Sequence, residues 1–334
     1  MLRVLTLVRS AILATALSTT GFAEERLDVD PSKPNRLLLH VCERNGTPIR
    51  PLVQDVTLRH KFDRQGTPDV SADGSHVVFD AWPADLGFAW QESRVIMVNF
   101  DGTEAKDVCD GVMPSFSPDG KQIVVSRAAV FGEPDGAKGM SIWTLSVDGS
   151  AKKMIADRGA WGGRWSPDGK SIVFRGGRDE DGNAVPQNIL RVYDLKSGET
   201  RNAFSEDESP FNEMSFHFEW SKHGRQVACT GTLKENGQPG LVVIDIDKGT
   251  KSIKIIKAED ENVRFISGSS IDWHPDDNQI LVMSFVNGTV EPRSVAIDRG
   301  TLPVQITYKQ ENVMIVDACF SSDGESLIAA VRAR

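Results

Sequence analysis

The stretch FSPDGKQIVV, at residues 116–125, combines a tight turn with the start of a buried strand. Ser117 offers a side-chain acceptor, Pro118 fixes φ, and Asp119 and Gly120 supply a turn former and a permissive exit, as a type I turn requires. An aromatic residue before the turn and an apolar run after it are typical of a buried hairpin. The stretch therefore predicts two packed antiparallel strands that are joined at this turn.

The same plan recurs along the chain at intervals of roughly 46 to 55 residues. A second clear copy, WSPDGKSIVF, covers residues 165–174, and weaker copies cover residues 70–74, 220–224, 273–277 and 320–324. After the turns come an apolar strand, a polar loop, a third strand that ends in a turn signal, and a short polar strand. A period of about 40–50 residues is typical of propeller blades. We therefore predict an all-β, six-bladed β-propeller of four-stranded antiparallel blades.

The two ends of the sequence each predict half of a blade. Residues 37–53 form a hairpin pattern around Asn45-Gly46 with no Ser-Pro-Asp-Gly turn before it, as expected for two outer strands. Residues 317–332 supply two inner strands with no outer strands after them. Pairing the N-terminal outer strands with the C-terminal inner strands completes one blade and removes open sheet edges. We therefore expect a closed ring over residues 37–334.

Residues 1–23 have the pattern of a secretory signal peptide. Two arginines precede a short apolar run at 11–17, and small residues occupy the −3 and −1 positions of a cleavage site after Ala23. The run is shorter than the ~20 residues that span a bilayer, so a membrane anchor is the alternative rather than the prediction. We expect a polar arm at 24–36 and a mature protein that is periplasmic or secreted, without a transmembrane segment. No sustained helical periodicity follows the leader.

The composition disfavours nucleic-acid binding. Thirty-eight basic and 47 acidic residues give a formal net charge of −9, which repels phosphate backbones. No basic cluster with interleaved aromatic residues offsets this charge. Four cysteines lack both CxxC and metal-ligand spacing, and their apolar settings favour buried thiols that pack as small hydrophobic groups over disulfides: Cys42, Cys109, Cys229 and Cys319.

The repeated unit resembles that of a known family. An aromatic residue, Ser-Pro-Asp-Gly-Lys and an apolar strand are similar to the repeat of TolB-like, WD40-like propellers, over nearly all of residues 37–334. The resemblance implies a six-bladed propeller, an exported location and a binding or scaffolding role. TolB proteins carry a further α/β domain before the propeller, whereas only residues 24–36 separate the leader from the first strand here. The resemblance is to the propeller alone, and it implies no role in the TolB pathway.

Residues that every repeat shares are interpreted as framework. The turn aspartates are expected to cap their own turns rather than to form a ring of metal ligands: Asp73, Asp119, Asp168 and Asp323. The aromatic residues before the turns are expected to pack between blades rather than to stack on a ligand: Phe116, Trp165, Trp220, Trp273 and Phe320. Candidate functional residues therefore lie where the repeats differ.

One set of candidates lies in the loop at residues 80–90. Three aromatic residues there are candidate anchors for a partner, because Trp is enriched at interface centres: Trp82, Phe88 and Trp90. The alternative is a loop that folds over its own blade.

A second set of candidates forms a mixed ring near the expected channel mouth: His60, Asp69, Trp161, Arg164, His217, Glu219, Asp272 and Asp317. Such a ring suits a small ligand or a divalent cation, and a water-filled lining is the alternative. The sequence assigns no cofactor.

Motifs for catalysis are mostly absent, with no nucleophile elbow, zinc-protease motif, dinucleotide loop or phosphate loop. We predict a monomeric, non-enzymatic binding or scaffolding protein that presents its loop-rich face and central funnel to a cell-envelope protein or small ligand. The alternative is a propeller-type lyase or hydrolase that acts on an anionic polysaccharide through His60, Arg164 and His217. That activity requires the three side chains to converge on one pocket.

Overall fold

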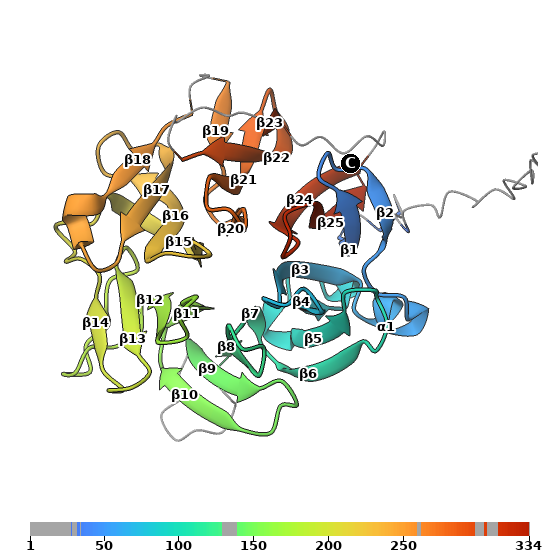
Figure 1. Cartoon of the computed structure of the whole chain (residues 1–334), viewed down its shortest axis with the longest axis horizontal. Coiled ribbons are helices and arrows are strands. Elements are labelled where there is room, and N and C mark those ends of the chain that lie inside the picture. Colours follow the sequence, from blue (N-terminus) through green and yellow to red (C-terminus); the bar gives the residue numbers. More distant parts are fainter. Residues whose placement is uncertain are drawn as a thin grey trace, which may run out of the picture.

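The computed structural model describes residues 28, 32–33, 35–128, 139–258, 262–297, 304–305 and 313–333. The predicted signal peptide and most of the polar arm lie outside the described residues. Within the described residues the strands form six sheets, which surround a central axis as the blades of a propeller (Figure 1). The predicted all-β, six-bladed architecture is confirmed.

Blades 1 to 5 follow one another along the chain. Blades 1 to 4 each begin with the strand nearest the axis, and two short strands share the inner position in blade 5. Blades 1 and 2 contain β3 (Arg64–Val70), β4 (His76–Trp82), β5 (Arg94–Asn99), β6 (Lys106–Asp110), β7 (Val112–Phe116), β8 (Gln122–Ala128), β9 (Met140–Ser146) and β10 (Lys152–Ala156). Blades 3 and 4 contain β11 (Trp161–Trp165), β12 (Ser171–Arg175), β13 (Leu190–Asp194), β14 (Thr200–Asn202), β15 (Phe211–Trp220), β16 (Gln226–Leu233), β17 (Pro239–Asp245) and β18 (Lys254–Ile256). Blade 5 contains β19 (Val263–Phe265), β20 (Ile271–Trp273), β21 (Gln279–Val286), β22 (Thr289–Ala296) and β23 (Val304–Gln305).

The closing blade joins the two ends of the chain as predicted. Its strand order is β2 (Pro48–Pro51), β1 (Leu38–Glu43), β25 (Ser326–Ala333) and β24 (Val313–Phe320). β1 runs antiparallel to β25, with register from Leu38 opposite Val331 to Glu43 opposite Ser326. The N-terminal strands are the outer pair and the C-terminal strands the inner pair, so the ring is closed by hydrogen bonds between the ends of the chain.

The hydrophobic core lies between neighbouring blades. In β25, Leu327 and Ala329 pack with residues of blade 5, whereas Ile328 and Ala330 pack with residues of blade 1. Alternate residues of one strand therefore face two different neighbours, which explains why the second strand of a blade reads as a continuous apolar run. The four cysteine side chains are buried within these layers, as predicted.

The repeated turn is held by its own aspartate. Ser117 Oγ donates to Asp119 Oδ1 at 2.6 Å, and the same carboxylate oxygen accepts from the backbone N–H of Lys121 at 3.1 Å. Equivalent Ser–Asp bonds are present in three further copies of the turn, at Asp73, Asp168 and Asp323. Each of these carboxylates is used locally, which confirms their interpretation as caps.

The aromatic residues before the turns tie blade to blade. Trp220 and Trp273 are 2% and 0% exposed. The indole of Trp220 donates to the backbone oxygen of Arg164 in blade 3, and that of Trp273 donates to the backbone oxygen of Glu219 in blade 4. Their packing role is confirmed.

A short helix, α1 (Val56–Lys61), lies at the outer edge of the ring between the closing blade and blade 1 (Figure 1). Asp55 caps it by accepting from Leu58 N at 3.0 Å. A helix this short presents no repeated apolar face, so it left no periodic signal in the sequence. The 3₁₀ turns are η1 (Ala84–Leu86), η2 (Trp90–Glu92) and η3 (Gly249–Ser252). Among the described residues, no helix has the length and apolar character needed to cross a membrane.

Candidate functional site

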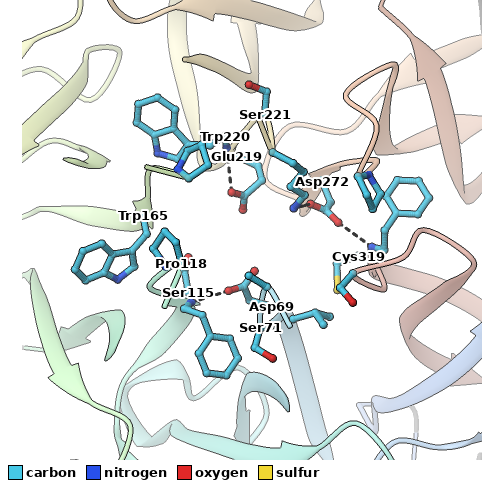
Figure 2. Close-up of a pocket in the computed structure, with 18 of the residues that line it drawn as sticks. Asp69, Ser71, Ser115, Pro118, Trp165, Glu219, Trp220, Ser221, Asp272 and Cys319 are labelled. Atoms are coloured by element: carbon cyan, nitrogen blue, oxygen red, sulfur yellow. Dashed lines mark hydrogen bonds and ion pairs between the residues drawn. The ribbon is translucent and has the colours of Figure 1, made fainter. Parts of the chain in front are cut away.

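The channel has two ends, which we name by the segments that surround them. The turn face carries the Ser-Pro-Asp-Gly turns and their variants, and the loop face carries the segments that enter the inner strands and join second to third strands. At the turn face, residues from all six blades line a cavity of about 290 Å³. Figure 2 shows Asp69, Glu219 and Asp272 around its central space.

These acidic residues occupy one repeated position, two residues before the Ser or His that opens each turn. The six blades place different side chains there: Asp69, Ser115, Arg164, Glu219, Asp272 and Cys319. The backbone position therefore recurs in every blade, whereas the charge of the side chain at that position differs between blades. Five of these six side chains, all except that of Arg164, line the cavity around the axis.

Two of the carboxylates also link neighbouring blades. Asp69 Oδ2 accepts from Phe116 N of blade 2 at 2.6 Å, and Asp272 Oδ2 accepts from Phe320 N of the closing blade at 2.8 Å. Burial raises the pKa of Asp69, and the charges of Arg164 and Lys222 oppose that effect. Each carboxylate uses one oxygen for a backbone amide, and the other oxygen of Asp272, Oδ1, accepts from Lys222 Nζ at 2.7 Å.

The third carboxylate pairs with an arginine. Glu219 Oε2 lies 3.0 Å from Arg164 Nε, and Glu219 Oε1 accepts from the N–H of Trp220 at 3.0 Å. The guanidinium also donates to the backbone oxygens of Met113 and Gly163, both at 3.1 Å. Burial raises the pKa of Glu219 to about 7, although the charge of Arg164 opposes the shift.

Lys222 places a cation at the cavity. It stands where the clear copies of the turn have Pro118 and Pro167, and its ammonium donates to Asp272 Oδ1 at 2.7 Å. Burial lowers the pKa of Lys222, but the carboxylates of Asp272 and Glu219 outweigh burial and hold the pKa above its ordinary value. The ammonium is therefore charged at neutral pH.

A second pair of acidic residues, Asp317 and Asp80, meets at Thr67 of β3. Asp317 Oδ2 accepts from Thr67 N at 2.8 Å, and Asp80 Oδ2 accepts from Thr67 Oγ1 at 2.5 Å and Met113 N at 2.7 Å. Burial, with a contribution from the charge of Asp317, raises the pKa of Asp80 to about 7. Burial also raises the pKa of Asp317.

Aromatic residues pack at the loop-face end of the channel. The ring centroids of Trp90 and Trp161 are 5.3 Å apart, those of Trp161 and Phe216 5.7 Å, and those of Phe216 and His217 4.7 Å. Trp90, Trp161 and Phe216 pack against an apolar cluster that contains Met113. His217 is buried, and burial lowers its pKa to about 3, so its imidazole is neutral at physiological pH.

The aromatic loop presents one exposed ring. Trp82 is 8% exposed, and its indole donates to the backbone oxygen of Gly87 within the loop at 2.9 Å. Phe88 is 76% exposed and meets Trp82 edge-on, and the guanidinium of Arg64 lies over both rings. Trp82 and Trp90 are thus packed within the protein, and Phe88 remains the anchor candidate of this loop.

The structure does not place His60 in the funnel. His60 lies on α1, where its Nε2 is 3.1 Å from Asp28 Oδ2. Helix α1 lies at the outer edge of the ring, so His60 does not converge with Arg164 and His217, as the lyase-like alternative requires (Figure 1). The remaining funnel candidates lie in the inner strands, but they are divided between the two ends of the channel and do not form one ring: Asp69, Trp161, Arg164, His217, Glu219, Asp272 and Asp317.

Sequence reasoning missed Lys222, Asp80 and Asp277. Asp277 replaces the turn glycine in blade 5, with φ of 58°, and its carboxylate accepts from the backbone N–H groups of Lys222 and His223. Lys222 and Asp277 both break the repeat at a fixed position, which is the signal that identifies them. No group of three or more His, Cys, Asp or Glu side chains within the described residues is arranged to hold a metal ion.

Comparisons with known proteins support the fold. Scans with protein-family models and with curated protein sequences gave no match. A structure described as putative TolB from Agrobacterium tumefaciens is similar, with a TM-score of 0.61 and 16% identity, over 90% of this chain and 98% of that one. TolB from Acinetobacter baumannii is similar with a TM-score of 0.55 and 12% identity, over 91% of this chain and 67% of that one. Hydrazine synthase from Kuenenia stuttgartiensis is similar with a TM-score of 0.54 and 14% identity, over 81% of this chain and 45% of that one.

Identities this low establish a shared fold and no more. The chain has the TolB-like six-bladed propeller fold.

Proposed function

We propose that this chain is an exported, non-enzymatic binding protein that holds part of a partner in the channel mouth on the turn face. The observation that carries the proposal is the cavity there, which Asp69, Glu219 and Asp272 line around the propeller axis. Its volume of about 290 Å³ is at the lower end of small-molecule sites. That size suits a side chain or short segment of a partner better than a large ligand.

A charged side chain is not a general requirement of this repeated position, although Asp69 and Asp272 also bond to neighbouring blades. Ser115 and Cys319 occupy the same repeated position in blade 2 and the closing blade, so the fold accepts uncharged side chains there. Removing carboxylates from water costs free energy, which Arg164 and Lys222 offset only in part. A cleft that concentrates titratable groups with shifted pKa values is a candidate functional site for this reason.

Two arrangements favour binding over catalysis. Arg164 is engaged by Glu219 and by two backbone oxygens, and His217 is buried among Phe216 and other aromatic residues at the far end of the channel. Neither side chain stands free beside the turn-face cavity to act on a substrate. The role proposed here is therefore recognition.

Export and the monomeric state belong to the same proposal. Export rests on the charge, apolar length and small-residue pattern of residues 1–23. Mass spectrometry of the mature protein should give an N-terminus at Glu24, and material that retains Met1 in the cytoplasm would contradict it.

The binding site is tested by blocking the cavity without disturbing the fold. Ala72 is exposed and lines the cavity, so Ala72→Trp places an indole over the mouth. Met154, on the outer edge of blade 2 and 49% exposed, provides the matched control Met154→Trp. We expect capture of cell-envelope proteins by the wild type and by Met154→Trp, and loss of the same proteins with Ala72→Trp.

A third variant, Phe88→Ala, separates the two faces. Phe88 is 76% exposed beside Leu86, which is 52% exposed, so the loop face also presents an apolar contact. If Phe88→Ala loses the captured proteins and Ala72→Trp keeps them, the partner binds the loop face and the turn-face proposal is wrong.

A further inference from the structure

The turn of blade 4 departs from the plan of the other turns. His223 replaces the capping aspartate, and Ser221 Oγ, in a residue only 2% exposed, has no hydrogen-bond partner within the described parts of the chain. Asp277 of blade 5 holds the turn instead, through the N–H groups of Lys222 and His223. Ser221, Lys222 and His223 all line the cavity. Local rules that are broken at a cleft are expected where a residue serves function rather than folding.

What this departure brings to the cavity is an ammonium group. Lys222 Nζ lies 2.7 Å from Asp272 Oδ1, and 35% of the lysine side chain is exposed, against 8% for Asp272. Proline at this position fixes the turn, whereas lysine contributes nothing to turn geometry. The lysine therefore acts through its charge. Its side chain is partly exposed to solvent while its ammonium contacts the buried carboxylate of Asp272.

The mouth has two layers that match the two parts of a lysine side chain. Pro118, Pro167 and Pro275 contribute apolar surface from the turns, and the carboxylates of Asp69 and Asp272 belong to the inner strands that lead into the turns. A lysine side chain buries its methylene stem on apolar surface while its ammonium reaches a polar partner. Lys222 already shows that such a side chain can reach this floor.

The hydrogen-bond geometry selects an ammonium over a guanidinium. The backbone amides of Phe116 and Phe320 each take one oxygen of Asp69 and Asp272, so each carboxylate offers one oxygen to the channel. Arginine gains its advantage from two parallel bonds to both oxygens of one carboxylate, whereas lysine binds as a point charge. Single oxygens on separate strands therefore favour a primary ammonium.

We propose that the turn-face mouth recognises a lysine side chain of a partner peptide, and that Lys222 is a built-in occupant which the incoming lysine displaces. This inference rests on the proposed function, because it names the chemistry of the group bound at the same site. Lys222 lowers the affinity of the site for a partner lysine, because the incoming ammonium must compete with an ammonium that is tethered to the site.

The test uses defined peptides and the full mature protein. The probe is the capped pentapeptide Gly-Gly-Lys-Gly-Gly, with norleucine and arginine versions as comparisons, and binding is measured by titration calorimetry at low salt. Lys222→Met removes the occupant and keeps the apolar stem. Lys170→Met is the matched control, because Lys170 follows the turn of blade 3, is 77% exposed and changes the net charge equally.

We expect Lys222→Met to bind the lysine peptide at least ten-fold more tightly than the wild type, and Lys170→Met to equal the wild type. The norleucine peptide should not bind, the arginine peptide should bind more weakly than the lysine peptide, and Asp272→Asn added to Lys222→Met should abolish binding. Lys222→Ala repeats the test should the methionine variant fold poorly.

Equal binding of lysine and norleucine peptides, or no gain in Lys222→Met and Lys222→Ala, would overturn the inference. If Ala72→Trp nevertheless prevents capture of the envelope proteins, the proposed binding function stands and only the lysine assignment is lost. If Ala72→Trp has no effect, both are lost.

Discussion

The two ends of the channel carry different kinds of side chain on the same inner strands. At the turn face, Asp69, Glu219 and Asp272 surround a cavity, and Lys222 and Arg164 offset part of their charge. At the loop face, Trp90, Trp161 and Phe216 pack on one another and on an apolar cluster. One end holds charge around open space, and the other is filled with aromatic side chains.

This contrast teaches where to look for function in a repeat protein. The backbone of the turn face is nearly the same in every blade, so a single substitution such as Lys222 for proline changes chemistry without changing shape. The loop face varies in segment length, and its aromatic residues Trp90, Trp161 and Phe216 pack on one another. Differences of residue type within a constant frame are therefore the stronger functional signal here.

The largest expected effect comes from opening the ring, because both ends depend on it. Deletion of residues 320–334 removes β25, the strand that pairs with β1 and packs against blades 1 and 5. We expect loss of the whole cooperative stability, which is of the order of 5–15 kcal/mol for a domain. Thermal unfolding followed by circular dichroism measures it. A truncated protein that melts cooperatively at the wild-type midpoint would show that the remaining blades do not need closure.

The next largest effect separates stability from binding. Trp161→Ala removes the central ring of the loop-face aromatic row, and we expect the free energy of unfolding to fall by about 2–4 kcal/mol because a packed aromatic contact is lost. Affinity for the lysine peptide in the Lys222→Met background should change less than two-fold. Trp161→Phe serves as control and should recover part of the stability. A large loss of affinity with Trp161→Ala would mean that the two ends are coupled.

A smaller effect concerns Asp80, which lies between the two ends. Its pKa in the folded protein is about 7, above the ordinary 3.8, so the native state binds more protons than the unfolded state between these values. Stability from this group therefore falls as pH rises through that window. We expect the free energy of unfolding of the wild type, relative to Asp80→Asn, to fall by about 2 kcal/mol between pH 5 and pH 7.

Urea unfolding of both proteins across this pH range measures the difference. Contributions from the buried histidines His40 and His217, whose pKa values are lowered, are common to both proteins and cancel. A difference that does not change with pH would mean that Asp80 keeps an ordinary pKa.

The smallest expected effect is at the exposed ring of the loop face. Phe88→Ala should change the free energy of unfolding by no more than about 0.5 kcal/mol, because the side chain is largely in solvent. Trp82→Ala, in the same loop but buried, is the comparison and should cost clearly more. Equal losses in urea unfolding would show that Phe88 supports the loop rather than facing a partner.

Much of the fold could be predicted because its signals are local and repeated. The turn FSPDG, the apolar strand after it and the half-blades at the two ends each appear within a few residues, and six copies reinforce one another. The helix α1 was missed because one isolated turn-and-a-half of helix has no repeat and no periodic face. Its omission is what wrongly placed His60 near the axis.

The site could be predicted only in part, because its contacts cross between blades. The axial position of Glu219 and Asp272 follows from their offset within the repeat. The bond between Lys222 and Asp272, and the support of the Lys222 turn by Asp277, join residues about fifty positions apart. Only the relative placement of blades 4 and 5 reveals them, although the substitution of Lys222 for proline is visible in the sequence.

Because Leu38 pairs with Val331, the ring can close only after β25 has been synthesised. The residues of β1 and β2 are synthesised early, whereas β25, which pairs with the inner edge of β1, is synthesised after the other strands. Until then, β1 presents unpaired backbone groups to any other strand it meets. Closing a loop that encloses almost the entire chain is slow relative to forming a blade from adjacent segments. Insertion of β25 should therefore limit the folding rate, and substitutions in that strand should slow refolding more than substitutions in blades 2 or 3.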